Sequence, residues 1–241
     1  MHHETSQVGN KRNSRQIPLS RREWLVTVGL ILLAVVPVLA GSVRVGQLTV
    51  GAASTPVTPE NARFFAAPLP VIVHIIGSSL YALVGAFQFV PRLRLRYPRW
   101  HRWAGWLLVP AGLSSSLSGL WMAQFYPWPA GDGVVLYGMR LLVGGGMTLS
   151  LVLAVVAVRQ RRFAQHGAWM VRAYALGLGA GTQVLTAIIW AVLGGASGEA
   201  GRNVVMGGGW LINIIVAEWV IQRRLTRPQR KTALVPSDSR S

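Results

Sequence analysis

Cysteine is absent from this chain of 241 residues. Its absence excludes disulfides, thiolate metal sites, covalently attached c-type haem and cysteine nucleophiles. Charged residues are also scarce, at 13% of the sequence, whereas a water-soluble domain carries about a quarter. The mean hydropathy is +0.41, and no polar segment is long enough to form a separate aqueous core. The composition therefore predicts one domain that lies in lipid.

Acidic residues are the rarer charged class, with 7 Asp and Glu against 24 Lys and Arg, which gives a net charge of +17. Such an excess in a soluble protein would indicate nucleic-acid binding. Here the basic residues are confined to the segments between apolar runs, so we expect the lipid bilayer, and no nucleic acid, as their partner. Neither hydrolysis nor nucleotide-driven transport is indicated, because the sequence shows no Ser/His/Asp arrangement, HExxH motif, pair of catalytic carboxylates or P-loop.

Six apolar runs reach or approach the length of about 20 residues that a membrane-spanning helix needs. They cover residues 24–43, 69–90, 103–125, 134–158, 168–193 and 204–222. The sequence therefore predicts an all-α fold, a polytopic bundle of six transmembrane helices formed by residues 23–224. Residues 1–22 are expected to be a basic cytoplasmic tail, and residues 225–241 a disordered cytoplasmic tail.

Basic residues alternate between the connections of this bundle. The first, third and fifth connections hold only Arg44, Arg63 and Arg202, whereas both tails and the other two connections are rich in arginine. The positive-inside rule then places both termini in the cytoplasm, in agreement with an even number of spans. The first run, with small residues at 40–42, also fits a signal peptide. We expect it to be retained as a helix, and cleavage would leave five spans.

Two histidines open predicted spans that run in the same direction from the cytoplasmic side. His101 opens the third span and His166 opens the fifth. Two neutral imidazoles that face each other would ligate a six-coordinate b-type haem. Arg102 and Arg172 would neutralise the haem propionates, and Trp169 would pack against the ring. Such a redox module would pass electrons to a membrane quinone or to a partner protein.

Two other interpretations of this inner group remain open. Glu218, at a nearby level in the sixth span, would complete a metal site of two histidines and one carboxylate with His101 and His166. Alternatively the group is structural. The histidines then bind headgroups or loop carbonyls, and Arg172 pairs with Glu218, because an unpaired charge at this depth is costly.

A second polar group lies toward the outer boundary. With a rise of about 1.5 Å per residue, His74 and Arg140 lie roughly 9 Å below that boundary, and Gln183 lies slightly deeper. We expect His74 to accept a hydrogen bond from Arg140 or Gln183 in an outer polar cluster. This group favours a non-enzymatic protein, either a carrier of a small solute or protons or an assembly partner in a membrane complex. Whether the chain is an enzyme is left open.

Glycine is abundant inside the predicted spans, for example at Gly177, Gly179 and Gly181. Small residues let transmembrane helices approach closely, so we expect these glycines to mark helix contacts. None of them follows a predicted strand, which argues against a dinucleotide-binding or phosphate-binding loop.

Four segments in combination resemble a known family. They are His74 with Gly77 and Gly85-Ala-Phe-Gln-Phe89, then Pro98-Arg-Trp-His-Arg-Trp-Ala-Gly105, then His166-Gly-Ala-Trp-Met-Val-Arg172, and finally Trp210-Leu-Ile-Asn213 with Glu218. Over about residues 63–224 the chain resembles the bacterial multi-pass membrane proteins grouped as domain-of-unknown-function family 2306. The resemblance implies a helical domain in the bacterial inner membrane with three intramembrane or juxtamembrane histidines, His74, His101 and His166. It implies no particular activity.

Overall fold

Helices make up the fold of the residues that the structure, a computed structural model, describes, which are 20–51 and 53–226. They are α1 (Arg21–Val50), α2 (Ala62–Ala66), α3 (Pro68–Gln88), α4 (Pro91–Arg96), α5 (Pro98–Phe125), α6 (Val134–Arg159), α7 (Phe163–Gly177), α8 (Gly179–Val192) and α9 (Glu199–Leu225). No strand occurs in these residues, so the all-α class is confirmed for them. Residues 1–19 and 227–241 of the two expected tails lie outside the described part.

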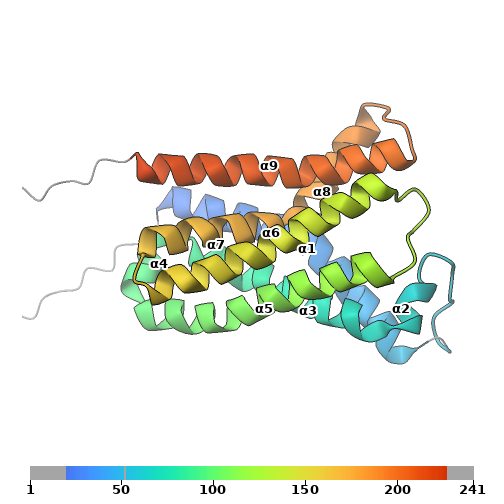
Figure 1. Cartoon of the computed structure of the whole chain (residues 1–241), viewed down its shortest axis with the longest axis horizontal. Coiled ribbons are helices and arrows are strands. Elements are labelled where there is room, and N and C mark those ends of the chain that lie inside the picture. Colours follow the sequence, from blue (N-terminus) through green and yellow to red (C-terminus); the bar gives the residue numbers. More distant parts are fainter. Residues whose placement is uncertain (1–19, 52, 227–241) are drawn as a thin grey trace, which may run out of the picture.

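The long helices lie side by side along the long axis of the molecule (Figure 1). We name the two ends of the bundle by their short helices. The α2 end holds α2 and the connections that follow α1, α5 and α8; it corresponds to the predicted outer side. The α4 end holds α4, the start of α1 and the end of α9 (Figure 1).

Four of the described helices are long and apolar enough to cross a membrane by length and composition, namely α1, α3, α6 and α9. The pair α7 and α8 would be a fifth crossing if the two helices form one broken span. Helix α5 is not among them although it has 28 residues. Its basic first turns and the serines at 114–116 and 118 lower its hydropathy. The structure therefore supports four to five spans by this criterion and leaves the predicted six unconfirmed.

The fifth predicted span is not one continuous helix. It breaks at Leu178, and the two halves, α7 and α8, are bent by 48°. Three glycines around the break each allow a different neighbour to approach. A Cβ at Gly177 would lie 3.1 Å from the ring of Tyr81, one at Gly179 would lie within 2.5 Å of the Trp210 indole, and one at Gly181 would overlap backbone of α1. The expectation that these glycines mark close helix contacts is confirmed.

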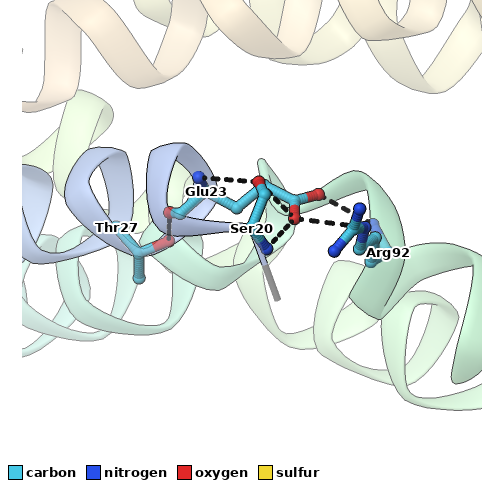
Figure 2. A network of polar contacts seen from close by, with 4 residues as sticks. All are labelled: Ser20, Glu23, Thr27 and Arg92. Atoms are coloured by element: carbon cyan, nitrogen blue, oxygen red, sulfur yellow. Dashed lines mark hydrogen bonds and ion pairs between the residues drawn. The ribbon is translucent and has the colours of Figure 1, made fainter. Parts of the chain in front are cut away.

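The first turn of α1 is fixed by a capping box that also joins it to α4. The Ser20 hydroxyl accepts a hydrogen bond from the Glu23 amide at 3.2 Å, and the Glu23 carboxylate accepts one from the Ser20 amide at 2.9 Å (Figure 2). The same carboxylate lies 3.5 Å from the guanidinium of Arg92 in α4 (Figure 2). This network positions the start of α1 at the α4 end of the bundle.

Candidate functional site

A cavity of about 450 Å³ lies inside the bundle and extends to the α2 end. Residues of α1, α2, α3, α5, α6, α7, α8 and α9 line it, together with the segment 126–129 that follows α5. The break between α7 and α8 forms part of its wall through Leu178. The polar or charged side chains in the lining are those of Arg63, His74, Ser78, Ser79, Ser115, Ser116, Tyr126, Trp128, Arg140, Gln183 and Trp210.

The three residues of the predicted outer polar cluster, His74, Arg140 and Gln183, all line this cavity. They do not bond to one another in the described part of the chain. His74 Nδ1 lies 2.8 Å from the carbonyl oxygen of Ser115 in α5. A carbonyl oxygen only accepts, so Nδ1 carries the proton and Nε2 is the acceptor in the neutral ring. The predicted hydrogen bond from Arg140 or Gln183 to His74 does not occur among the described residues, where His74 and Gln183 bond to backbone carbonyls and Arg140 contacts a carboxylate.

Arg140 is bound by a carboxylate from the connection that follows α5. Its Nη1 lies 2.7 Å from Asp132, whose side chain is only 1% exposed. The second oxygen of Asp132 accepts from Arg202 of α9, with Nε at 2.7 Å and Nη2 at 2.6 Å. One buried carboxylate thus joins α6 to α9 at the α2 end and neutralises one of the two arginines that it contacts.

Gln183 and the helix break are held by α9. The Gln183 amide donates to the carbonyl oxygen of Met206 at 3.2 Å. Asn213 bridges the two halves of the broken span, because its amide nitrogen donates to the Ala175 carbonyl in α7 at 2.9 Å and its oxygen accepts from the Thr182 hydroxyl in α8 at 2.7 Å. A break in a helix frees backbone groups that lipid cannot satisfy, so such a side chain stabilises it.

The inner group at the α4 end is organised around an ion pair. Arg172 of α7 donates from Nε and Nη2 to the two carboxylate oxygens of Glu218 in α9, at 2.6 and 2.8 Å. The predicted pair of Arg172 and Glu218 is confirmed. The guanidinium also lies 4.6 Å from the centre of the Trp169 ring, a cation–π contact. Arg172, Glu218 and Trp169 therefore form a structural link between α7 and α9, and Arg172 already has a carboxylate partner in place of a haem propionate.

His101 and His166 lie within electrostatic range of each other, at the starts of α5 and α7. His166 Nδ1 lies 3.0 Å from the carbonyl oxygen of Ala154, so Nδ1 donates and Nε2 is left as the acceptor. His101 Nδ1 is buried and has no hydrogen-bond partner in the described residues. Arg102 is exposed beside it.

The described residues contain no group of three or more His, Cys, Asp or Glu side chains that could hold a metal ion. The expected metal site of His101, His166 and Glu218 is therefore not assembled in this part of the chain. Both oxygens of Glu218 are instead bonded to Arg172.

Several residues that shape the cavity have no predicted role in the sequence analysis. Asp132, Asn213 and Thr182 act through hydrogen bonds to partners far apart in the chain, at separations of 70, 38 and 31 residues. The position of Asn213 near the middle of an apolar run was a usable signal, because a polar amide at that depth requires partners. No local pattern signals Asp132, which lies in a polar connection.

Apolar helices with their hydrophobic faces exposed, packed around a mostly apolar cavity that holds a few polar side chains, define a multi-pass helical membrane protein that contacts the lipid bilayer. The chain belongs to the family described as "Predicted membrane protein (DUF2306)", which matches residues 71–221, more than half of its length. This match confirms the resemblance and includes His74, His101 and His166. Comparisons with curated proteins and with solved structures each found no match.

Proposed function

We propose that this protein binds a small solute in the cavity between α1, α3, α5, α6, α8 and α9 and carries it across the membrane. The observation that supports the proposal is the cavity of about 450 Å³ at the break between α7 and α8. Its volume lies within the range of small-molecule sites, and its lining combines apolar walls with a few polar side chains.

The broken span gives this cavity a functional interpretation. In lipid, an interruption of helical backbone is tolerated only where protein or a cavity satisfies the freed groups. Broken helices in secondary transporters lie at substrate sites near the middle of the bilayer. Here the break at Leu178 lies on the cavity wall, and Asn213 holds the two halves.

A cavity-filling substitution tests the proposal. Ala180 and Ala191 are both exposed residues of α8, but only Ala180 lines the cavity. Purified wild type, Ala180→Trp and Ala191→Trp are screened for thermal stabilisation by a defined set of amino acids, organic acids, sugars, amines and nucleosides. A ligand that binds the folded state raises the midpoint of unfolding.

We expect at least one solute to stabilise wild type and Ala191→Trp and to have no effect on Ala180→Trp. That solute should then enter proteoliposomes that contain wild type faster than those that contain Ala180→Trp. If no solute stabilises the wild type, or if Ala180→Trp responds like the control, the solute-binding proposal is wrong.

A b-type haem held by His101 and His166 is the second candidate, and one observation favours it. His166 donates from Nδ1 to a backbone carbonyl, which is the arrangement that orients a ligating imidazole with Nε2 free. When bound, the haem would supply one-electron chemistry, with a quinone or protein as partner. We expect a reducible Soret band in the purified protein that is lost in His101→Ala or His166→Ala; a colourless protein would exclude this candidate.

We further infer six crossings, with α5 as the sixth, and both termini in the bacterial cytoplasm. Support comes from the length of α5 and from the arginine-rich segments at the α4 end. Because the chain has no cysteine, single exposed cysteines report sidedness without background. A membrane-impermeant maleimide should label Ser54→Cys and Ser197→Cys in intact cells, and Gln160→Cys only after permeabilisation. The opposite labelling would reverse the orientation, and labelling of all three in intact cells would refute it.

A further inference from the structure

The charged side chains that line the cavity are both arginines, Arg63 and Arg140. Carboxylates at this end of the bundle lie elsewhere. The side chain of Asp132 is only 1% exposed and forms ion pairs with Arg140 and Arg202. Glu60 and Glu199 are exposed and do not line the cavity. The cavity therefore presents positive charge to an occupant, without a carboxylate in its wall to balance it.

Arg140 retains donors for a ligand. Its contact with Asp132 uses Nη1, and no other hydrogen bond of this guanidinium occurs in the described residues. The same carboxylate is shared with Arg202, so the two arginines carry one positive charge more than Asp132 neutralises. A guanidinium presents five N–H donors in a planar fork, which leaves several for an acid group of the ligand.

Arg63 of α2 contributes a second guanidinium at the wall of the cavity. It donates from Nη1 to the carbonyl oxygen of Pro127 at 3.3 Å and lies 4.6 Å from the centre of the Phe64 ring. Neither contact neutralises its charge, and no ion pair of Arg63 occurs in the described residues. Burial lowers its pKa from the ordinary value, yet arginine stays protonated in proteins. Arg63 lies within electrostatic range of Arg140 and also of Asp132, the carboxylate that Arg140 contacts.

We infer that the solute is a small organic anion, with its acid group held by Arg140 and Arg63 and its apolar part against Met147, Leu176 and Trp210. This inference rests on the proposed solute-binding function. Met147, Leu176 and the ring of Trp210 line the same cavity from α6, α7 and α9. Hydrogen bonds between a guanidinium and a carboxylate are charge-assisted and stronger than those to a neutral acceptor, so an anionic ligand gains more at these arginines than a neutral ligand of the same shape.

Matched ligands test the charge. Binding of hexanoate, hexanamide and hexylammonium to the purified full-length protein is measured by titration calorimetry, as is binding of benzoate, benzamide and benzylammonium. Each set keeps the apolar part and changes only the charge of the head. We expect the carboxylate of at least one set to bind at least tenfold more tightly than its amide, and the ammonium compounds not to bind.

A matched pair of variants tests the residues. Arg140→Gln should reduce the preference for carboxylate over amide to less than threefold. Arg202 also pairs with Asp132 but does not line the cavity, so Arg202→Gln should leave the preference for carboxylate over amide unchanged. Arg63→Gln should reduce this preference in part. The wild-type comparison of carboxylate with amide needs no variant, so the inference stays falsifiable if Arg140→Gln fails to fold.

The acid group has two sources, a water-soluble organic acid and an anionic lipid headgroup. Protein in phosphatidylglycerol nanodiscs is therefore compared with protein in phosphatidylcholine nanodiscs. If the carboxylate probe binds in both kinds of nanodisc, the natural ligand is a soluble acid. If the probe binds only in phosphatidylcholine nanodiscs, the phosphatidylglycerol headgroup occupies the same site.

Two results would overturn the inference, and they differ in whether the proposed solute binding also fails. If the amides or ammonium compounds bind as tightly as the carboxylates and Ala180→Trp blocks them, the anion inference is wrong while solute binding stands. If none of the six probes binds, the anion inference fails, and solute binding then depends on the wider stability screen.

Discussion

Asn213 is expected to be the main polar stabiliser of the broken span. Replacement by leucine removes one hydrogen bond to Ala175 and one from Thr182. Each is worth about 1 kcal/mol net, and a buried carbonyl left without a donor costs roughly 1–3 kcal/mol. Measured interhelical hydrogen bonds in membranes average about 0.6 kcal/mol. Together these values predict that Asn213→Leu lowers the free energy of unfolding by about 2–4 kcal/mol.

The measurement is reversible unfolding in mixed micelles of a mild detergent and dodecyl sulfate, followed by tryptophan fluorescence. Thr182→Val removes only the bond from the hydroxyl and should cost about 1 kcal/mol. The double variant Thr182→Val with Asn213→Leu should then cost about 1 kcal/mol less than the sum of the two single variants. If Asn213→Leu is as stable as wild type, or the two effects are additive, the bridge does not stabilise the break.

Four further substitutions have defined outcomes in the same unfolding assay. Gly181→Ala should lower the free energy of unfolding by about 1–3 kcal/mol, because its Cβ would overlap the backbone oxygen of Leu33. The control Gly145→Ala lies in open space on α6 and should be neutral or slightly stabilising. Equal effects of the two substitutions would contradict the packing argument. Asp132→Asn should lower the free energy of unfolding by about 3 kcal/mol, because Arg140 and Arg202 lose a buried counter-ion. An unchanged free energy would show that these ion pairs are not formed. Glu218→Gln should destabilise the protein less than Asp132→Asn does, because the Glu218 carboxylate is more exposed than that of Asp132. A larger loss of stability in Glu218→Gln would contradict this ranking.

The places of the long helices could be predicted from apolar runs, because a lipid-embedded helix must be apolar over a fixed length. The break at Leu178 could not be predicted in this way. Hydropathy is an average over the length of a span, so it does not detect a bend of 48° within an apolar segment. The glycines at 177, 179 and 181 signal close packing, but their contacts are with α3, α6, α9 and α1, which only the assembled bundle brings near.

The site was predicted in part. Depth along each helix places His74, Arg140 and Gln183 at comparable levels, and they line one cavity. Their bonding partners could not be predicted, because Ser115 presents a backbone carbonyl and Asp132 comes from a connection without periodicity. The pairing of Arg172 with Glu218 was predictable, since two opposite charges at one depth in lipid have few other partners.

Helix α1 gives the cavity one of its walls, so processing of the N-terminus would change the shape of the cavity. Ala34, Pro37 and Val38 line the cavity, and all three precede the small residues at 40–42. A polypeptide cut at those small residues would lose this side of the cavity. The interior of the cavity would then open sideways to the acyl chains of the surrounding lipid.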